Sequence, residues 1–419
     1  MELITEYGTV FLILAGVFGL FMAWGIGAND VANAMATSVG SKALTIKQAI
    51  IVAAIFEFAG AFFVGSHVTN TVRKGIIDPL FFAGQPELLA YGMFAALLAA
   101  AIFQHAATFF GFPVSTTHAI VGALFGFGIM GAGFSSVNWS KIGVISSGWI
   151  ISPLLGALVS FILFQTIRKF ILAKDNPYQA ITRAAPLIVF VQCTIIVLSV
   201  IYKGLKNLHL DFPFSQALLI AVSLGILCAS LTWEVMRRRK TNVAKNEQYV
   251  QVEKVFAILQ VYTASYIAFA HGANDVANAI GPVAAIFSII KTNTIIMKVN
   301  VPPWILMLGG VGIVVGLSTY GYKVIETIGK KITEITPSRG FAAEFATAST
   351  VLIFSKLGLP VSTTHTMVGS VIGVGFARGI ATLNLRVIRN IFASWFITIP
   401  SAALLTVIIY WIILRLSSL

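Results

Sequence analysis

Charged side chains are scarce in this chain of 419 residues: they make up 10% of it, whereas hydrophobic residues make up 58%. A soluble domain of this length needs a far more polar surface, so the composition excludes the soluble globular classes. The chain is therefore predicted to be a polytopic membrane protein embedded in a lipid bilayer. We expect no soluble domain, and the longest polar stretch, 237–253, is interpreted as a cytoplasmic linker.

Cysteine and acidic residues are also few. The only cysteines, Cys193 and Cys228, fall within apolar segments at no metal or redox spacing, so they are interpreted as small buried hydrophobic residues. The formal net charge is +13, but the basic residues lie in short connections between apolar runs. Basic residues in such positions orient a protein in the membrane, so no nucleic-acid partner is expected.

Long apolar runs are what the chain has in abundance. A membrane-spanning helix needs about 20 apolar residues. Eight runs meet this requirement, at 8–35, 47–65, 141–165, 186–202, 214–233, 253–282, 302–320 and 386–415. We therefore expect an all-α fold with eight full crossings.

Two further apolar segments, 88–134 and 341–377, do not fit single crossings. Each is interrupted halfway by the string PVSTTH, at 113–118 and 360–365, with too few polar residues for a loop outside the membrane. We interpret each segment as a re-entrant hairpin of two half-helices. Its non-helical tip would lie at membrane depth, where only protein or a water-filled cavity can satisfy the backbone.

A second string, GANDVANA, is also duplicated, at 27–34 and 272–279. The second copy lies five crossings after the first, so the two copies run in opposite directions. This arrangement predicts an inverted-topology repeat, as in many secondary transporters. The domains would be a first repeat at 1–165, a connector at 166–252 and a second repeat at 253–419.

Basic residues in the loops predict the orientation of this arrangement. One side carries roughly 19 Lys and Arg and the other roughly 8, so the positive-inside rule makes the first side cytoplasmic. Both termini are then expected to be extracytoplasmic, in a multi-pass protein of the cell membrane. The first hairpin would enter from outside, and the second from the cytoplasm.

The GANDVANA strings place polar side chains in the middle of apolar helices. A lone carboxylate at the centre of such a helix costs about 2.5 to 3.5 kcal/mol on insertion scales, so it needs a proton, a cation or polar partners. Broken helices at these positions would offer side-chain and backbone oxygens, the ligands that sodium or a proton relay requires. The alternative is that small residues and Asn merely pack helices together. The candidate sodium ligands are Asn29, Asp30, Asn33, Asn274, Asp275 and Asn278.

The PVSTTH strings would supply the opposite kind of ligand. Proline followed by hydroxyl residues indicates the start of a helix, where unpaired N–H groups and a positive dipole end attract anions. Two facing tips would surround a tetrahedral anion with hydroxyls from Ser115, Thr116, Thr117, Ser362, Thr363 and Thr364. His118 and His365 follow the tips and are expected to orient them through hydrogen bonds.

Three polar residues have no counterpart in the other half. Glu57 aligns with Ile313, Gln104 with Val351, and Glu344 with Leu97. Glu57 lies in the middle of a span, which marks it as a functional candidate. Glu344 could instead be a boundary residue near the cytoplasmic interface.

With GANDVANA and PVSTTH in both halves, together with IFEF at 55–58 and RKGIID at 73–78, the sequence resembles the inorganic phosphate transporter (PiT) family over nearly its whole length. The resemblance implies cation-coupled uptake of inorganic phosphate, with functional positions at Asp30, Asp275, Glu57, Gln104, Glu344 and both Ser-Thr-Thr tips. The chain lacks the long soluble loop of many animal members, so the regulatory roles of that loop are not carried over.

Several alternatives remain open. The paired Asn-Asp-Asn clusters favour sodium over protons, so we predict a sodium–phosphate symporter that works by alternating access. The family also contains proton-coupled transporters of phosphate or metal phosphate, and sulfate permeases. A channel would also use re-entrant loops, whereas an intramembrane enzyme lacks support because no HExxH-type spacing is present. We expect no cofactor other than transported sodium, and a homodimer is compatible with the sequence, which does not fix the oligomeric state.

Overall fold

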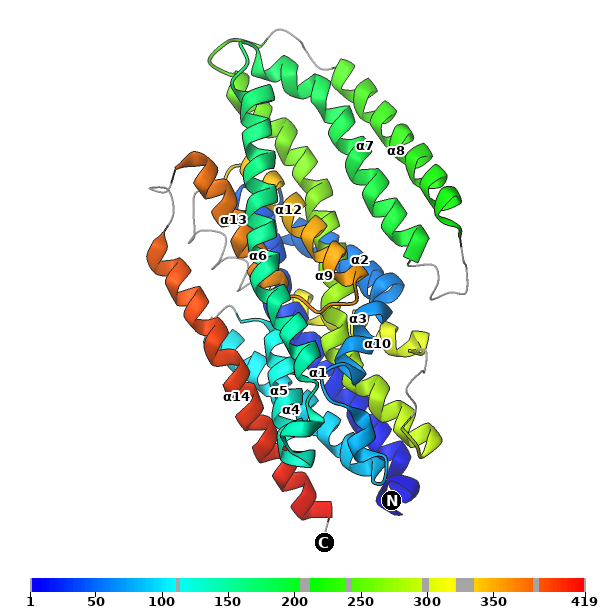
Figure 1. Ribbon diagram of the computed structural model, residues 1–419. Helices are drawn as coiled ribbons and strands as arrows, with labels where there is room; N and C mark the ends of the chain where they lie inside the picture. The colour runs from blue at the N-terminus through cyan, green and yellow to red at the C-terminus, as the bar shows by residue number, and fades with distance from the viewer. Residues whose placement is uncertain are drawn as a thin grey trace.

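The computed structural model describes residues 2–110, 114–203, 212–238, 243–295, 301–321, 335–379 and 384–417. Within these ranges the regular elements are helices, and the β contacts are limited to an isolated bridge between Ile77 and Val137. Figure 1 shows them as one elongated bundle. The helices are α1 (Glu2–Gly40), α2 (Ile46–Val64), α3 (Ser66–Lys74), η1 (Pro79–Phe82), α4 (Pro86–Phe109), α5 (Thr116–Ala132), η2 (Phe134–Ser136), α6 (Trp139–Ile167), η3 (Arg168–Leu172), α7 (Pro177–Lys203), α8 (Phe214–Arg237), α9 (Gln248–Thr292), α10 (Pro303–Gly316), η5 (Leu317–Gly321), α12 (Pro337–Lys356), α13 (Thr363–Arg378) and α14 (Leu385–Ser417).

Nine helical segments in the described part of the chain are long and apolar enough to cross a membrane. Eight of them overlap the eight predicted crossings, and the ninth, α4, is the first arm of the first predicted hairpin. An all-α polytopic membrane fold is therefore confirmed. The two chain ends lie at the same end of the bundle (Figure 1), as an even number of crossings requires.

Both predicted hairpins are present as pairs of packed helices, α4 with α5 and α12 with α13. In Figure 1 the first pair lies in the half of the bundle that holds the termini, and the second pair lies in the other half. The first arms are longer than the half-helices we expected, with 24 residues in α4 and 20 in α12. Each arm begins with proline and polar residues that precede the apolar run, so α4 starts two residues and α12 four residues before the predicted segments.

The helices that carry the GANDVANA strings are continuous, which corrects the prediction of broken helices. α1 runs for 39 residues and α9 for 45, and within α1 the one non-helical residue is Tyr7, far from the motif. The backbone carbonyls of the motif therefore remain within the helix. These carbonyls accept hydrogen bonds from the helix's own N–H groups. The ligand atoms available here therefore belong to side chains.

Glycine allows two pairs of helices to cross with their backbones in contact. A Cβ on Gly27 would lie 1.9 Å from the carbonyl oxygen of Ile313, and one on Gly272 would lie 2.1 Å from that of Glu57. Helix α1 is thereby held against α10, and α9 against α2. The contacted residues Ile313 and Glu57 are the two that the alignment of the halves pairs, so the crossings match even though the inverted repeat remains a prediction.

The second arms of the hairpins are held in the same way. A Cβ on Gly122 of α5 would lie 2.6 Å from the carbonyl oxygen of Ile399 on α14, and one on Gly369 of α13 would lie 2.2 Å from that of Pro153 on α6. Two tightly packed pairs result, α5 with α14 and α13 with α6. Each pair joins a hairpin arm of one predicted half to a crossing of the other.

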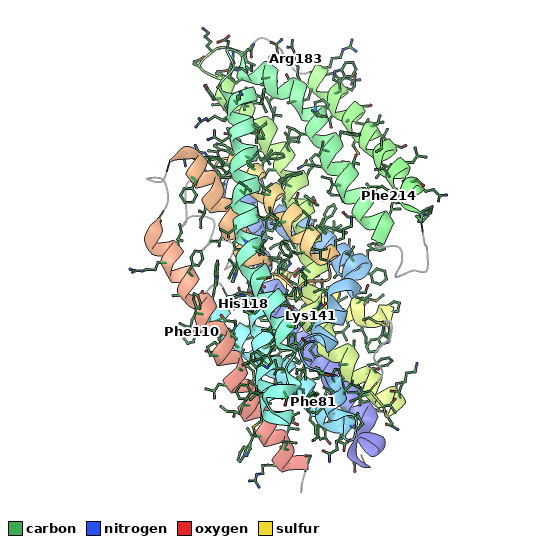
Figure 2. The ribbon with its side chains drawn as sticks, viewed as in Figure 1. Phe81, Phe110, His118, Lys141, Arg183 and Phe214 are labelled. Carbon is green, nitrogen blue, oxygen red and sulfur yellow. The ribbon has the colours of Figure 1, made fainter. Side chains whose placement is uncertain are left out.

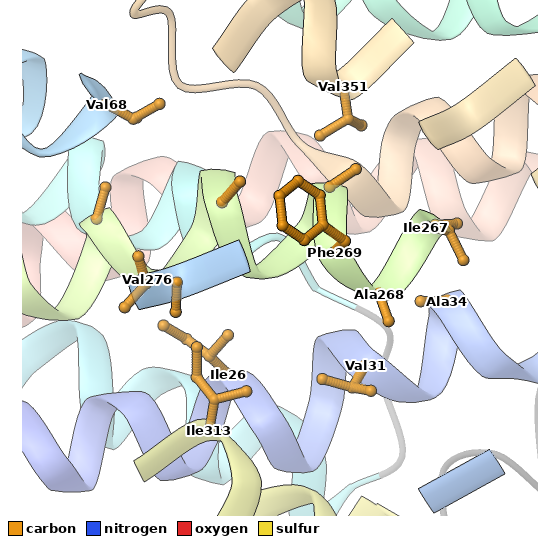
Figure 3. Close-up of a cluster of buried hydrophobic side chains, with 14 of the residues drawn as sticks. Ile26, Val31, Ala34, Val68, Ile267, Ala268, Phe269, Val276, Ile313 and Val351 are labelled. Atoms are coloured by element: carbon orange, nitrogen blue, oxygen red, sulfur yellow. The ribbon is translucent and has the colours of Figure 1, made fainter. Parts of the chain in front are cut away.

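Apolar side chains surround the middle of α1 and α9. Figure 3 shows Ile26 and Val31 of α1 facing Phe269 and Val276 of α9, with Ile313 of α10 beside them. All five are at most 1% exposed. The polar motifs therefore lie within a closely packed interior, where water is excluded and each polar group needs a protein or ion partner.

Two helices of the predicted connector, α7 and α8, pack against each other at one edge of the bundle (Figure 1). Cys193 on α7 and Cys228 on α8 lie close to each other in this pair. The sequence spacing gave no sign of this contact, because the two cysteines come together only when α7 and α8 pack side by side.

Candidate functional site

Two aspartates from opposite halves of the sequence meet in the core. One carboxylate oxygen each from Asp30 of α1 and Asp275 of α9, together with a ring nitrogen of His271, all lie within 4.8 Å of one another. All three residues are at most 2% exposed. Two carboxylates this close repel each other when both are ionised, so a bound cation or proton lowers the free energy of the cluster.

A hydroxyl from each hairpin tip binds the carboxylate of the corresponding aspartate. Thr116 Oγ1 donates a hydrogen bond to Asp30 Oδ2, and Thr363 Oγ1 donates to Asp275 Oδ2 at 2.7 Å. Helix α1 therefore contacts the first tip, and α9 contacts the second, in matching geometry. The structure brings together the two motifs that lie far apart in each half of the sequence.

The asparagines of the motifs bind the hairpins on either side of the aspartates. Asn29 Nδ2 donates to Thr108 Oγ1 at 2.8 Å, and Asn278 Nδ2 donates to Thr117 Oγ1 at 3.2 Å. Asn274 accepts from Ser355 Oγ at 2.9 Å when its amide is oriented to donate to Asp275 Oδ1 at 3.0 Å. The side chain of Asn33 lies outside the described residues.

The two tips also contact each other. Thr117 Oγ1 of the first tip donates to the carbonyl oxygen of Val361 in the second tip at 3.1 Å. Thr117 and Thr364 are 1% and 2% exposed. The hydroxyl residues are thus enclosed between α1 and α9 rather than spread along a solvent-exposed rim.

The serines of the tips have a structural role in this conformation. Ser115 Oγ accepts from the backbone N–H of His118 at 3.3 Å, and Ser362 Oγ accepts from that of His365 at 3.2 Å. Each serine is therefore the N-cap of its helix. Its own O–H remains a donor, so capping fixes the hydroxyl at the positive end of the helix without removing its capacity to bind an anion.

Glu57, Gln104 and an additional histidine complete the cluster. Gln104 Nε2 lies 3.4 Å from Asp30 Oδ1. His271 bridges two carboxylates, with Nδ1 2.8 Å from Glu57 Oε2 and Nε2 2.8 Å from Asp275 Oδ2. Sequence reasoning missed His271. It is an ionisable residue inside an apolar helix, at the position where the first half has Ile26. An ionisable residue in such a helix indicates a functional site.

Glu344 lies in a separate polar cluster. Its Oε1 accepts from Thr37, Ser38 and Gln260 at 2.6 to 2.9 Å, and its Oε2 accepts from Thr263 at 2.6 Å. Thr37 is seven residues beyond Asp30, about 10 Å along α1. Glu344 is completely buried, and its carboxylate is surrounded by donors from α1 and α9.

His118 and His365 do not use their rings as expected. Each histidine binds the serine of its own tip through its backbone N–H and not through its ring. The imidazole of His118 packs on Trp149 with ring centroids 4.0 Å apart, and that of His365 stacks on Trp395 at 3.4 Å. Both rings therefore pack on aromatic side chains of α6 and α14.

The sequence profile of a family described as the phosphate transporter family matches residues 26–406. A putative phosphate permease of Pyrococcus abyssi is 46% identical over 405 residues, which cover 96% of this chain and 98% of the relative. The chloroplastic inorganic phosphate transporter 2-1 of Arabidopsis thaliana is 46% identical over 429 residues, covering 96% and 72%. A solved structure described as the sodium-dependent phosphate transporter superposes with a TM-score of 0.90 at 42% identity, covering 96% of this chain and 99% of the other.

Proposed function

Because this chain belongs to the phosphate transporter family, we propose that it imports inorganic phosphate by sodium-coupled symport through alternating access. The observation that carries this proposal is the meeting of two hydroxyl-bearing tips with two buried aspartates. The solved relative is described as sodium-dependent, which supports sodium as the coupling ion. The relatives are permeases and transporters, and the chain is not an enzyme.

The tips and the motifs have complementary roles in this proposal. We assign phosphate to Gln104 and the hydroxyls of Ser115, Thr116, Thr117, Ser362, Thr363 and Thr364. Sodium is assigned to Asn29, Asp30, Asn33, Asn274, Asp275 and Asn278, with Glu57 and Glu344 contributing to coupling. Carboxylate, amide and hydroxyl oxygens are the hard ligands that suit a small cation, and hydroxyl donors at helix starts suit a tetrahedral anion.

The hydrogen bonds suggest an order of binding. Thr116 and Thr363 donate hydrogen bonds to Asp30 and Asp275, so these hydroxyls are occupied before any ion arrives. A sodium ion on each aspartate would neutralise it and compete for its oxygens. The hydroxyls would then be free to donate to phosphate, which makes anion binding depend on sodium.

Charge balance supports coupled uptake. Moving a dianion into an interior-negative cell costs about 4.6 kcal/mol per 100 mV, at about 2.3 kcal/mol per elementary charge. Two sodium ions with one monovalent phosphate would carry net positive charge inward, so the membrane potential would drive the cycle. The paired clusters around Asp30 and Asp275 offer two places for these ions.

The matched glycine crossings support the inverted repeat with halves 1–165 and 253–419 and a connector at 166–252. Alternating access would then exchange the arrangements of the two halves around the central site. We place the protein in the cell membrane with both termini extracytoplasmic. Accessibility of cysteines introduced at the two ends, measured in intact cells, tests this orientation.

Proton coupling is a second candidate, favoured by His271. This buried imidazole bridges Glu57 and Asp275 and could carry a proton in place of a cation. Uptake of radiolabelled phosphate into proteoliposomes under separately imposed sodium and proton gradients decides between the two ions. A sodium gradient is expected to drive accumulation above equilibrium, which also excludes a channel, and excess sulfate is expected to compete weakly.

Removing the tip hydroxyls is expected to weaken phosphate binding. Thr116→Val and Thr363→Val keep the side-chain shape but lose a donor to a charged group, a loss of about 1.5 to 3 kcal/mol. Each variant is therefore expected to lower the apparent phosphate affinity about 10- to 100-fold in uptake assays. Thr166→Val, on the exposed side of α6, is the matched control. Unchanged phosphate affinity in both tip variants would show that these hydroxyls do not bind phosphate.

Glu344→Gln is expected to disturb the second polar cluster. Both Glu344 oxygens accept hydrogen bonds from buried donors, whereas a glutamine amide would direct its own donors at one of these groups. Leaving such groups unsatisfied costs about 1 to 3 kcal/mol, so thermal stability and uptake are both expected to fall. Glu234→Gln, which alters an exposed ion pair on α8, is expected to leave both unchanged. Normal uptake by Glu344→Gln would contradict a coupling role.

A further inference from the structure

A cavity of about 560 Å³ lies behind the tips, between α6, α13 and α14. Its volume falls within the range of about 300 to 1,000 Å³ that is usual for ligand pockets. Apart from Ser146 and two imidazoles, its lining consists of apolar and aromatic residues. None of the proposed ion or phosphate ligands lines it, so the cavity has no role in the transport cycle described above.

The mouth of the cavity lies on a membrane-facing surface. Ile150 and Leu154 on α6 are 65% and 64% exposed, and Phe392 and Phe396 on α14 are 40% and 80% exposed. Both helices contain segments long and apolar enough to cross a membrane. Apolar residues exposed on such segments face hydrocarbon rather than water, so the cavity opens toward the interior of the bilayer.

Two contacts between histidine and tryptophan form the floor. His118 of α5 packs on Trp149 of α6, and His365 of α13 stacks on Trp395 of α14. Each contact crosses from one glycine-packed pair of helices to the other, because α5 packs on α14 and α13 packs on α6. Figure 2 shows His118 between α6 and α14, at the depth of the tip that it follows in the sequence.

The lining residues indicate which kind of molecule the cavity binds. Apolar cavities do not retain water and instead take up apolar molecules. If the cavity stayed empty, its lining residues would lose favourable packing contacts. At this mouth the surrounding solvent is lipid hydrocarbon. We propose that the cavity is a binding site for one acyl chain of a membrane lipid, inserted between α6 and α14 against the two histidine–tryptophan contacts.

An acyl chain at this position would influence the position of the hairpin tips. His118 and His365 each follow a tip threonine, so displacement of either ring moves the start of its helix. The bound chain braces the α5–α14 pair against the α6–α13 pair. This inference holds whichever ion is transported, because it depends on the cavity and not on the ligands at the tips.

Quenching of tryptophan fluorescence by brominated lipid tests the proposal. Trp395 is 6% exposed and lines the cavity, so bromine on an acyl chain approaches it most closely from within the cavity. In a variant with Trp395 as its one tryptophan, bilayers brominated near the ends of the acyl chains are expected to remove more than half of the fluorescence. Ser146→Phe, which places a phenyl ring in the lining of the cavity, is expected to restore it, and Ser147→Phe, outside the lining, is the matched control.

A reporter on the outer surface of the same helix separates cavity binding from ordinary lipid contact. Trp411 of α14 is 50% exposed, so a variant with this single tryptophan is expected to be quenched with or without Ser146→Phe. Equal fluorescence of Trp395 in brominated and unbrominated lipid would overturn the proposal. So would Trp395 quenching that persists unchanged in Ser146→Phe.

The chain with all its tryptophans provides an independent test, which does not depend on the folding of the single-tryptophan variants. A phospholipid with a photoactivatable diazirine near the end of its acyl chain is expected to label Trp395 or Ile372, which line the cavity. Labelling confined to outward residues such as Leu404, which is 63% exposed, would show that the chain does not enter and would refute the proposal.

Discussion

Asp275→Asn is expected to reduce sodium-dependent phosphate uptake at least about 100-fold. This corresponds to a loss of about 2.7 kcal/mol in stabilisation of the transition state for uptake. The amide keeps the shape of the carboxylate and can still accept the hydrogen bond from Thr363. It carries no charge, however, so it cannot neutralise a sodium ion and no longer pairs with His271. Asp30→Asn is expected to have the same effect through the matching contact with Thr116.

Uptake into proteoliposomes under an imposed sodium gradient measures this effect, and thermal unfolding in detergent establishes that both variants fold. Asp175→Asn changes an exposed loop carboxylate and is expected to transport normally. Wild-type uptake by both Asp30→Asn and Asp275→Asn would refute the assignment of sodium to these residues. Loss of uptake in only one of them would show that the two clusters do not contribute equally.

Gly272→Leu is expected to prevent stable folding. Its Cβ would lie 2.1 Å from the carbonyl oxygen of Glu57, so α9 and α2 would have to separate along their crossing. Overpacking usually costs about 1 to 3 kcal/mol when side chains can adjust, and here the opposing atom belongs to the backbone. The separation would also displace Glu57 from His271, so any protein that folds is expected to lose uptake.

The yield of monodisperse protein and its unfolding temperature measure the effect of this substitution. Gly143→Leu on α6 is the matched control, because no heavy atom lies within 4 Å of a Cβ built there. Gly27→Leu is expected to resemble Gly272→Leu, since its Cβ would meet Ile313 in the corresponding crossing. An unchanged unfolding temperature for Gly272→Leu would show that the helices tolerate separation.

Most of the helical architecture could be predicted from local sequence. Hydropathy located eight of the nine segments that are long and apolar enough to cross a membrane, since the length of an apolar run depends only on consecutive residues. The PVSTTH strings located both hairpin turns, because proline and hydroxyl residues mark a helix start in any context. The continuity of α1 and α9 was predicted wrongly, because helix breaking depends on whether neighbouring helices satisfy the polar side chains.

The sequence identified most residues of the candidate site, but not the contacts between them. The sequence singled out Glu57, yet its partner His271 lies 214 positions away and received no role. The four donors around Glu344 come from α1 and α9, and no spacing within either helix indicates that they converge. The aromatic contacts of His118 and His365 were likewise absent from any local pattern.

By itself, the sequence determined that this chain crosses a membrane several times, and it identified which polar residues interrupt its apolar helices. Those properties follow from the cost of placing each residue in hydrocarbon, which is a local quantity. Only the tertiary structure decided which carboxylate binds which hydroxyl, which helices touch through glycine, and that a cavity opens behind the tips. These features are set by the packing of segments 86 or more residues apart, and packing geometry is not encoded in the periodicity of any one helix.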